Sequence, residues 1–187
     1  PMKDVLDVLE SQKGALLCVA PLSRNIVEAV ADMSQELNAP VMLIASRRQL
    51  DAAELCPGYA NNWSTESFAE DVRRIGRGQL HLARDHGGPG QGAESEPALW
   101  MSAAKRSLEV DVESGLRFLH LDTSAASGDF EARIELLLEL YGHIHDFAAA
   151  KGIEIALEAG IEEHDGSPPD LSRLHHLLER LKAFCGR

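Results

Sequence analysis

The chain alternates between short apolar runs and longer segments whose apolar residues repeat at helical spacing. Five compact runs, bounded by glycine, proline or polar residues, predict buried strands. They cover residues 15–20, 41–45, 79–83, 116–121 and 153–157. Amphipathic spacing predicts helices between and around these strands. The helices are expected to begin near Val5, Ser23, Ser64, Pro97, Asp129 and Asp170.

This alternation predicts an α/β protein with a parallel sheet and right-handed crossovers, because parallel strands need a long connection. Two architectures fit the pattern: an open doubly wound sheet, and a (β/α) barrel that is cut short. A full eight-unit barrel takes about 250 residues, whereas this chain has 187. We expect consecutive βα units in a single domain over residues 1–187, a partial TIM barrel with five parallel strands.

Titratable residues follow three of the predicted strands. Asp85 and His86 come after the third strand, Asp122 after the fourth and Glu158 after the fifth, and the acids are spaced 37 and then 36 residues apart. Because parallel strands all end at one edge of a sheet, these side chains are expected to converge, and α/β proteins place ligand chemistry there. The alternative at Asp85 is an Asx-type turn followed by a surface histidine.

Three carboxylates and an imidazole at one rim allow two kinds of chemistry. They can bind a divalent cation such as zinc, with His86 as a ligand, or the crowded carboxylates Asp85, Asp122 and Glu158 can supply a general base. A metal that polarises a carbonyl would assist aldol cleavage or sugar epimerisation.

Structural explanations also exist for these residues. Asp122 after a strand can simply cap the next helix, and Glu158 can pair with a basic neighbour such as Arg84. His81 and His120 lie inside predicted strands, so we expect them to be packed rather than catalytic.

An irregular region over residues 46–65 is long for a connection, and such loops often carry function. It supplies three of four candidate substrate-binding residues, which are Arg47, Gln49, Tyr59 and Ser124. Arg47, with Arg48 and Arg84, is also a candidate for an anionic group of a ligand, although each can be an ordinary surface residue. The glycine-rich segment 87–97 is expected to be a mobile loop over the site.

The charge and the amino-acid composition exclude some classes of binding partner. The net charge of −12 argues against nucleic acid or an anionic membrane surface, since both require a basic face. No apolar run approaches the roughly 20 residues of a membrane span. Three cysteines without CxxC spacing indicate free thiols in a reducing cytoplasm, and the start at Pro1 suggests that a tag or leader has been removed. A truncated sheet leaves open edges, which predicts a homo-oligomer.

Three stretches resemble the non-catalytic subunit of bacterial class II tagatose-bisphosphate aldolase. They are a Gly-Tyr loop that leads into a helix at residues 58–68, an Asp-His-x-Gly-Pro turn at residues 85–89, and a His-Leu-Asp-x-Ser strand end at residues 120–124. The order and spacing agree over roughly residues 15–160. Glu158 falls where related class II aldolases carry an acid after the fifth strand.

The resemblance implies a TIM-type barrel, a sugar-phosphate ligand and support of a catalytic aldolase subunit as partner. In catalytic class II aldolases, the residue at Asp85 serves as acid or base and the one at His86 as a zinc ligand. The chain departs from the family in three ways. The second strand lacks the expected acid at residues 44–46, the stretch after Glu158 lacks the Val-Pro/Gly-Gly-Glu character of the family, and the family barrel is about twice as long. A fragment, a reduced relative and a chain completed by association all remain open.

Overall fold

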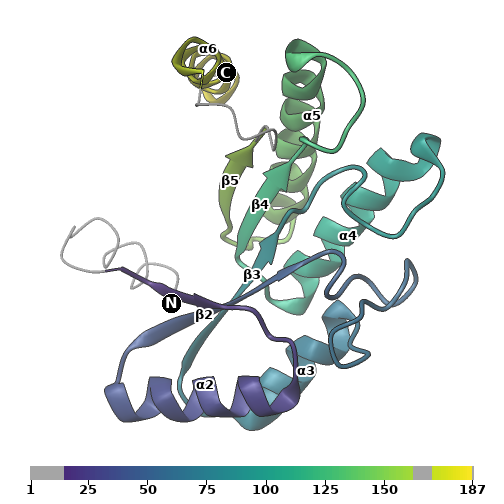
Figure 1. Ribbon diagram of the computed structural model, residues 1–187. Coiled ribbons are helices and arrows are strands. Elements are labelled where there is room, and N and C mark those ends of the chain that lie inside the picture. The colour runs from purple at the N-terminus through teal and green to yellow at the C-terminus, as the bar shows by residue number, and fades with distance from the viewer. Residues whose placement is uncertain (1–14, 162–169, 187) are drawn as a thin grey trace.

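The computed structural model describes residues 15–161 and 170–186, which form one parallel sheet with helices along it (Figure 1). The expected helix near Val5 lies outside the described residues. The strands are β1 (Leu17–Val19), β2 (Pro40–Ser46), β3 (Gln79–Asp85), β4 (Phe118–Asp122) and β5 (Ala156–Gly160). The helices are α2 (Arg24–Leu37), α3 (Thr65–Ile75), the short 3₁₀ turn η1 (Pro97–Leu99), α4 (Trp100–Ser114), α5 (Phe130–Ala150) and α6 (Leu171–Cys185).

The strands lie in the order β1-β2-β3-β4-β5, and every neighbouring pair is parallel. A doubly wound sheet would reverse its strand order at a switch point. The described strands show no such reversal, so each βα unit adds its strand beside the previous one, as in a (β/α) barrel. Five parallel strands with alternating helices were predicted, and the prediction is confirmed. No helix in the described ranges is long and apolar enough to cross a membrane.

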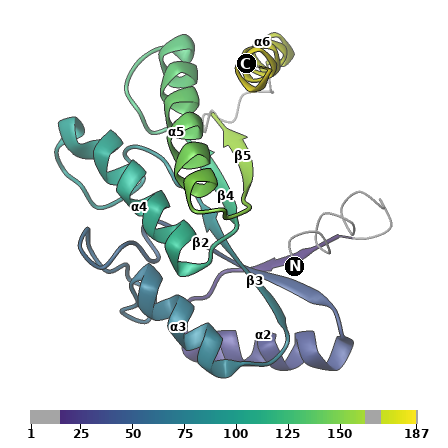
Figure 2. The same ribbon diagram turned by 180° about the vertical axis from the view of Figure 1, so that it is seen from behind.

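One face of the sheet packs against the helices, which form an arc along it (Figures 1 and 2). Alternate strand residues build this outer face because successive side chains in a strand point to opposite sides. Two apolar clusters result. One joins Val41, Leu43 and Ala45 to α2 and α3, and the other joins Leu119 and Leu121 to α4 and α5.

The opposite face of the sheet is concave and lines a cavity of about 440 Å³. Side chains from all five strands contribute to it, and most are apolar. They include Cys18, Met42, Ile44, Ala83, Phe118, His120, Ala156 and Glu158. Residues of both outermost strands line the same hollow, so the sheet curves as the wall of a barrel does.

Helix boundaries follow the signals in the sequence. Ser64 and Ser67 form a capping box at the start of α3, and Gly76 ends that helix in the left-handed conformation at φ 61°. Asp129 and Asp170 cap α5 and α6 through their carboxylates. These caps satisfy backbone N–H groups that have no partner within the helix.

The fifth strand begins later than expected, which moves Glu158. The apolar residues Ile153 and Ile155 pack against the α4–α5 cluster before the strand starts, and pairing with β4 begins only at Ala156. Glu158 therefore lies in the middle of β5, and Gly160 stands at its carboxyl end. The expectation that Glu158 directly follows a strand is wrong because the apolar pattern begins ahead of the hydrogen-bonded ladder.

Arg84 is fully buried on the outer face of β3. Its guanidinium donates to both carboxylate oxygens of Asp111 on α4, at 2.8 and 2.6 Å, and to the backbone oxygens of Ala45 and Leu50. Burial by itself would lower the pKa of Arg84, but the charge of Asp111 and the hydrogen bonds to it raise the pKa above its usual value. The possible pairing of Arg84 with Glu158 is not formed. Arg84 instead joins the β3–α4 unit to the β2–α3 unit before it and does not face a ligand.

Removing the Arg84 side chain should destabilise the protein strongly. Arg84→Met leaves the carboxylate of Asp111 buried without its cation, which typically costs about 3–5 kcal/mol. Arg24→Met is the control, because Arg24 pairs with Glu28 on the exposed surface of α2 and such pairs are worth less than about 1 kcal/mol. Urea unfolding measures both variants. Equal losses of unfolding free energy would contradict the structural role of Arg84.

Candidate functional site

Two acids and two histidines meet at the carboxyl ends of β3 and β4. Asp85 ends β3 and Asp122 ends β4, while His86 follows β3 and His120 lies two residues before the end of β4. The register pairs Arg84 with Leu119, so the next residues, Asp85 and His120, lie side by side. We call Asp85, His86, His120 and Asp122 the Asp–His cluster.

Asp122 orients His86. Its Oδ2 lies 2.5 Å from Nδ1 of His86 and accepts a second hydrogen bond, also of 2.5 Å, from the amide of Gln91. Its Oδ1 accepts the backbone N–H of Ser124 at 2.8 Å. The Asp122 side chain is buried. Because a carboxylate can only accept, neutral His86 carries its proton on Nδ1, which leaves the lone pair on Nε2.

Asp85 and His120 form the other half of the cluster. Nδ1 of His120 lies 3.3 Å from Oδ1 of Asp85, and the two imidazole rings of the cluster are 5.3 Å apart. Burial alone lowers the pKa of His120, but the hydrogen bond to Asp85 and the charges of Glu158 and Asp122 outweigh it, so the pKa is raised. The hydrogen bond from His120 lowers the pKa of Asp85. Each shift favours the charged form of its group, whereas a metal ion would require His120 as a neutral imidazole.

Glycines let the backbone approach the cluster closely. The Gly87 N–H donates to the carbonyl of His120 at 2.8 Å, and a Cβ on Gly88 would lie 1.4 Å from the carbonyl oxygen of Asp122. On the other side, a Cβ on Gly160 would lie 2.0 Å from Nε2 of His120. No side chain fits at Gly88 against the backbone of Asp122, and a side chain at Gly160 fits only if the His120 ring moves. Glycine at both positions therefore lets the ends of β3, β4 and β5 come together with the cluster intact.

His86 adopts a left-handed backbone conformation with φ of 46°. Residues other than glycine rarely adopt this conformation, which costs them of order 1 kcal/mol. Such strain is concentrated at functional sites, where the surrounding structure enforces it. Here, the turn that follows His86 carries the chain directly over the end of β4.

Glu158 shares the concave face with the cluster, because β5 pairs Glu158 with His120. The side chain is exposed, and its charge contributes to the raised pKa values of His120 and of Cys18 on β1. The structure thus brings Asp85, His86 and Asp122 into contact. Glu158 lies beside His120, two residues before the carboxyl end of β5.

The predicted substrate-binding residues lie at different distances from the cluster. Ser124 is adjacent, since its Oγ lies 3.5 Å from the amide of Gln91. Gln49 accepts the backbone N–H of Ser46 at the end of β2. Tyr59 is 69% exposed in the irregular region. Arg47 is buried and its guanidinium pairs with Asp51 and Glu94, at 2.8 and 2.5 Å.

The Arg47–Glu94 ion pair ties the segment 87–97 to the end of β2. The guanidinium also donates to the carbonyl of Gly88 at 3.2 Å, and Trp100 donates its indole N–H to the carbonyl of Glu94 at 3.0 Å. We expected a mobile loop over the site here. The structure holds the segment by these contacts and by those of Gly87 and Gln91 with β4. Arg47 acts in this arrangement as an anchor for the loop.

Three residues of the cluster present donors that suit a metal ion. One ligand atom each from Asp85, His86 and His120 can be chosen so that all lie within 4.8 Å of one another. Two imidazole nitrogens and a carboxylate oxygen match the three protein ligands of many catalytic zinc sites. Asp122 behind His86 matches the carboxylate that commonly fixes a histidine ligand. The donor set therefore fits a zinc-like divalent cation.

Sequence reasoning missed His120 and Gln91. We expected His120 to be only packed, yet it contacts Asp85. The signal was its spacing of two residues from Asp122, which places both on one face of a strand. Gln91 carried no comparable signal, because its contact with Asp122 depends on the path of the loop.

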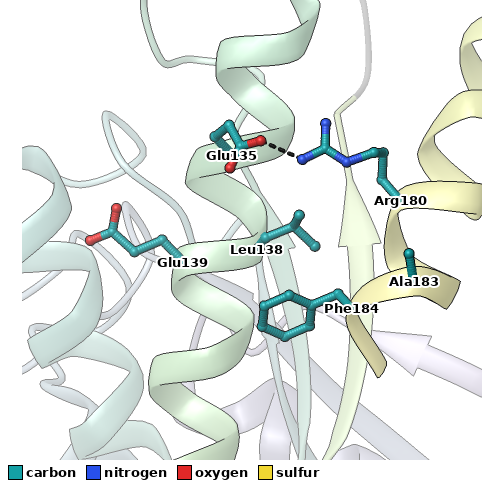
Figure 3. A pocket seen from close by; sticks show the side chains of 6 residues that line it. All are labelled: Glu135, Leu138, Glu139, Arg180, Ala183 and Phe184. Atoms are coloured by element: carbon teal, nitrogen blue, oxygen red, sulfur yellow. Dashed lines mark hydrogen bonds and ion pairs between the residues drawn. The ribbon is translucent and has the colours of Figure 1, made fainter. Parts of the chain in front are cut away.

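A second hollow, of about 490 Å³, lies between α5 and α6, and no residue of the Asp–His cluster lines it (Figure 3). Leu138 and Phe184 form its apolar floor, and Arg180 of α6 reaches across to Glu135 of α5. Glu139, its other acid, pairs with Lys105 of α4. Each titratable group that lines this hollow is thus in an ion pair between helices, which indicates helix packing.

A side chain at position 160 should displace His120. In Gly160→Ala, the new methyl group overlaps Nε2 of His120, so the ring has to leave Asp85 at a cost of about 1–3 kcal/mol. Gly142→Ala within α5 is the matched control and should stay within about 1 kcal/mol of the wild type. Urea unfolding and the NMR signals of the His120 ring measure the effect. Unchanged ring signals in Gly160→Ala would contradict the proposed crowding.

Comparison with known proteins identifies the fold. No protein-family model and no curated protein matches the sequence. A probable tagatose 6-phosphate kinase from Sinorhizobium meliloti is similar in structure, with a TM-score of 0.69 and 20% identity over 90% of this chain. A candidate phosphonomutase from Burkholderia cenocepacia has a TM-score of 0.54 and 15% identity over 91% of this chain. The chain spans 43% and 64% of these two proteins. Both are TIM-barrel-like, so the five βα units have the fold of a TIM-barrel segment.

Proposed function

We propose that this chain forms part of a barrel protein of sugar-phosphate metabolism with a divalent metal centre at Asp85, His86 and His120. The observation that carries the proposal is the convergence of these three donors within 4.8 Å at the strand-end face. TIM barrels place their active sites at that face. Zinc is the cation that the nitrogen and oxygen donors suit best.

The surrounding residues have defined roles in this proposal. Asp122 holds His86 with Nε2 as its lone-pair nitrogen. Asp85 is partly exposed and is the candidate acid or base through the carboxylate oxygen that does not hold the metal. The bound metal would polarise a carbonyl oxygen of the substrate. Ser124, Gln49 and Tyr59 remain candidates for substrate contacts, and Glu158 is a second candidate acid on the same wall. These roles support a lyase or epimerase reaction.

The sugar-phosphate part of the proposal rests on two supports. The Asp-His-x-Gly-Pro and His-Leu-Asp-x-Ser stretches resemble the tagatose-bisphosphate aldolase subunit family, and they supply all four members of the Asp–His cluster. One structural neighbour is named for tagatose 6-phosphate. The fold alone supports no substrate, because TIM barrels host many unrelated reactions.

Zinc titration of the purified protein tests the metal centre. We expect one zinc ion per chain, and we expect His86→Asn or His120→Asn to weaken binding by more than about 100-fold, beyond the typical effect of an outer-shell partner. His143→Asn is the matched control, because His143 pairs with Glu109 on the helical layer. Calorimetry gives the dissociation constants. A wild-type protein without zinc affinity, or cluster variants that bind like His143→Asn, would refute the metal centre.

A second candidate function is that of a partner-dependent subunit that supports a class II aldolase. The observation that favours it is the open concave face, where apolar side chains of β1, β2, β4 and β5 line an accessible cavity. Such surfaces commonly mark association sites. The same face and the outer edges of β1 and β5 make a homo-oligomer the alternative assembly.

Co-expression with a class II aldolase catalytic subunit distinguishes these assemblies. If the chain is a supporting subunit, the two proteins co-purify and the aldolase gains activity or half-life at 37 °C. Ile44→Glu places a charge in the apolar cavity and should abolish the gain, whereas Leu37→Glu at the exposed end of α2 should not. Co-purification of the chain only with itself, with no gain for the aldolase, would reject the supporting role.

A further inference from the structure

The turn that follows His86 delivers an amide into the Asp–His cluster. Residues 88–91 form a type II turn, in which the Gln91 N–H donates to the carbonyl of Gly88 at 3.3 Å. Pro89 occupies the second position and Gly90, at φ 76°, the third, as this turn type requires. Pro89 restricts the backbone of the turn, and the turn presents Gln91 toward Asp122.

The turn is also fixed from outside. Arg47 binds the carbonyl of Gly88 at its first residue, and Gly90 lies against the ring of Trp100, where a Cβ would come within 3.1 Å. Gln91 therefore reaches Asp122 from a segment that β2 and α4 both hold in place. Its 2.5 Å contact follows from this fixed path.

Gln91 and His86 donate to the same oxygen of Asp122, while Ser124 donates to the other. We infer that Gln91 is a positioning residue: it fixes the carboxylate plane of Asp122 and thereby keeps the proton of His86 on Nδ1. The inference rests on the proposed metal centre for its functional meaning, but the tautomer of His86 is a property of the protein alone. Without the amide, the buried Oδ2 of Asp122 loses one of its two donors, so that His86 and the Ser124 N–H hold the carboxylate plane less firmly.

The position of the proton on His86 matters because the other ring nitrogen, Nε2, faces Asp85. Nε2 of His86 is 3.6 Å from Oδ2 of Asp85, on the side where the three candidate ligands converge. When Asp122 turns away, Nδ1 loses its acceptor and the proton can move to Nε2, the nitrogen that a metal would use. A loop residue outside the ligand set thus sets the fraction of His86 that has its lone pair on Nε2.

The test is the state of the His86 ring in Gln91→Met, a variant of similar length that cannot donate. Long-range ¹H–¹⁵N NMR spectra of the full chain, assigned with His86→Asn, report which ring nitrogen is protonated. We expect Nδ1–H alone in the wild type and a measurable Nε2–H fraction in Gln91→Met. Zinc affinity should fall roughly 10-fold, the lower end of the range for outer-shell partners.

Gln79→Met is the matched control. Gln79 begins β3 at the opposite end of the sheet, where its amide donates to Asn38, and its substitution should leave both measurements unchanged. If Gln91→Met does not fold, Gln91→Asn carries the same test, because its shorter side chain does not reach Asp122. A His86 tautomer that is unchanged in the Gln91 variant, or that changes equally in Gln79→Met, overturns the inference. The ring measurement decides this even if the wild type binds no zinc, which would refute the proposed metal centre instead.

Discussion

The alternation of side chains along β3 and β4 is the constraint on which the site depends. Arg84 points to the helical layer and binds Asp111, and the next residue, Asp85, points to the concave face and meets His120. A shift of one residue in β3 would exchange these two environments. It would bury the Asp85 carboxylate beside the carboxylate of Asp111 and expose the guanidinium. The buried pair therefore fixes the register that places Asp85.

The ends of the strands are brought together by close backbone contacts rather than by long side chains. Gly88 passes over the carbonyl of Asp122, and Gly160 leaves room for the ring of His120. Three adjacent strands therefore end within reach of one another. The cluster draws its polar groups from only two of them, β3 and β4, and the remaining wall of the concave face is mostly apolar.

Much of this arrangement could be predicted from the sequence. Apolar runs bounded by breakers gave the five strands, and acids after the third and fourth strands gave Asp85 and Asp122. The error at Glu158 has a physical cause: Ile153 and Ile155 are apolar because they pack on the helices, although they precede the ladder of β5. An apolar pattern indicates which residues are buried. Here the partly buried residues begin at Ile153, before the pairing of β5 with β4 starts at Ala156. Arg47 and Arg84 were equally ambiguous, because a buried arginine with an acidic partner cannot be told from a ligand-binding one until the partner is located.

His86 shows most directly why the remaining contacts of the site could not be predicted from the sequence. The sequence Asp-His-Gly-Gly-Pro-Gly indicates a turn, but it does not give the sign of φ at His86 or the atom that its ring meets. The left-handed backbone at His86 turns the chain over β4, and this turn brings Nδ1 to Asp122 and Gln91 to the same oxygen. The strain at one residue thus produces the contact that orients its own side chain. Glycine at position 86 would adopt this backbone without strain but would have no ring to orient, so the conformational cost at His86 is consistent with a role for the imidazole.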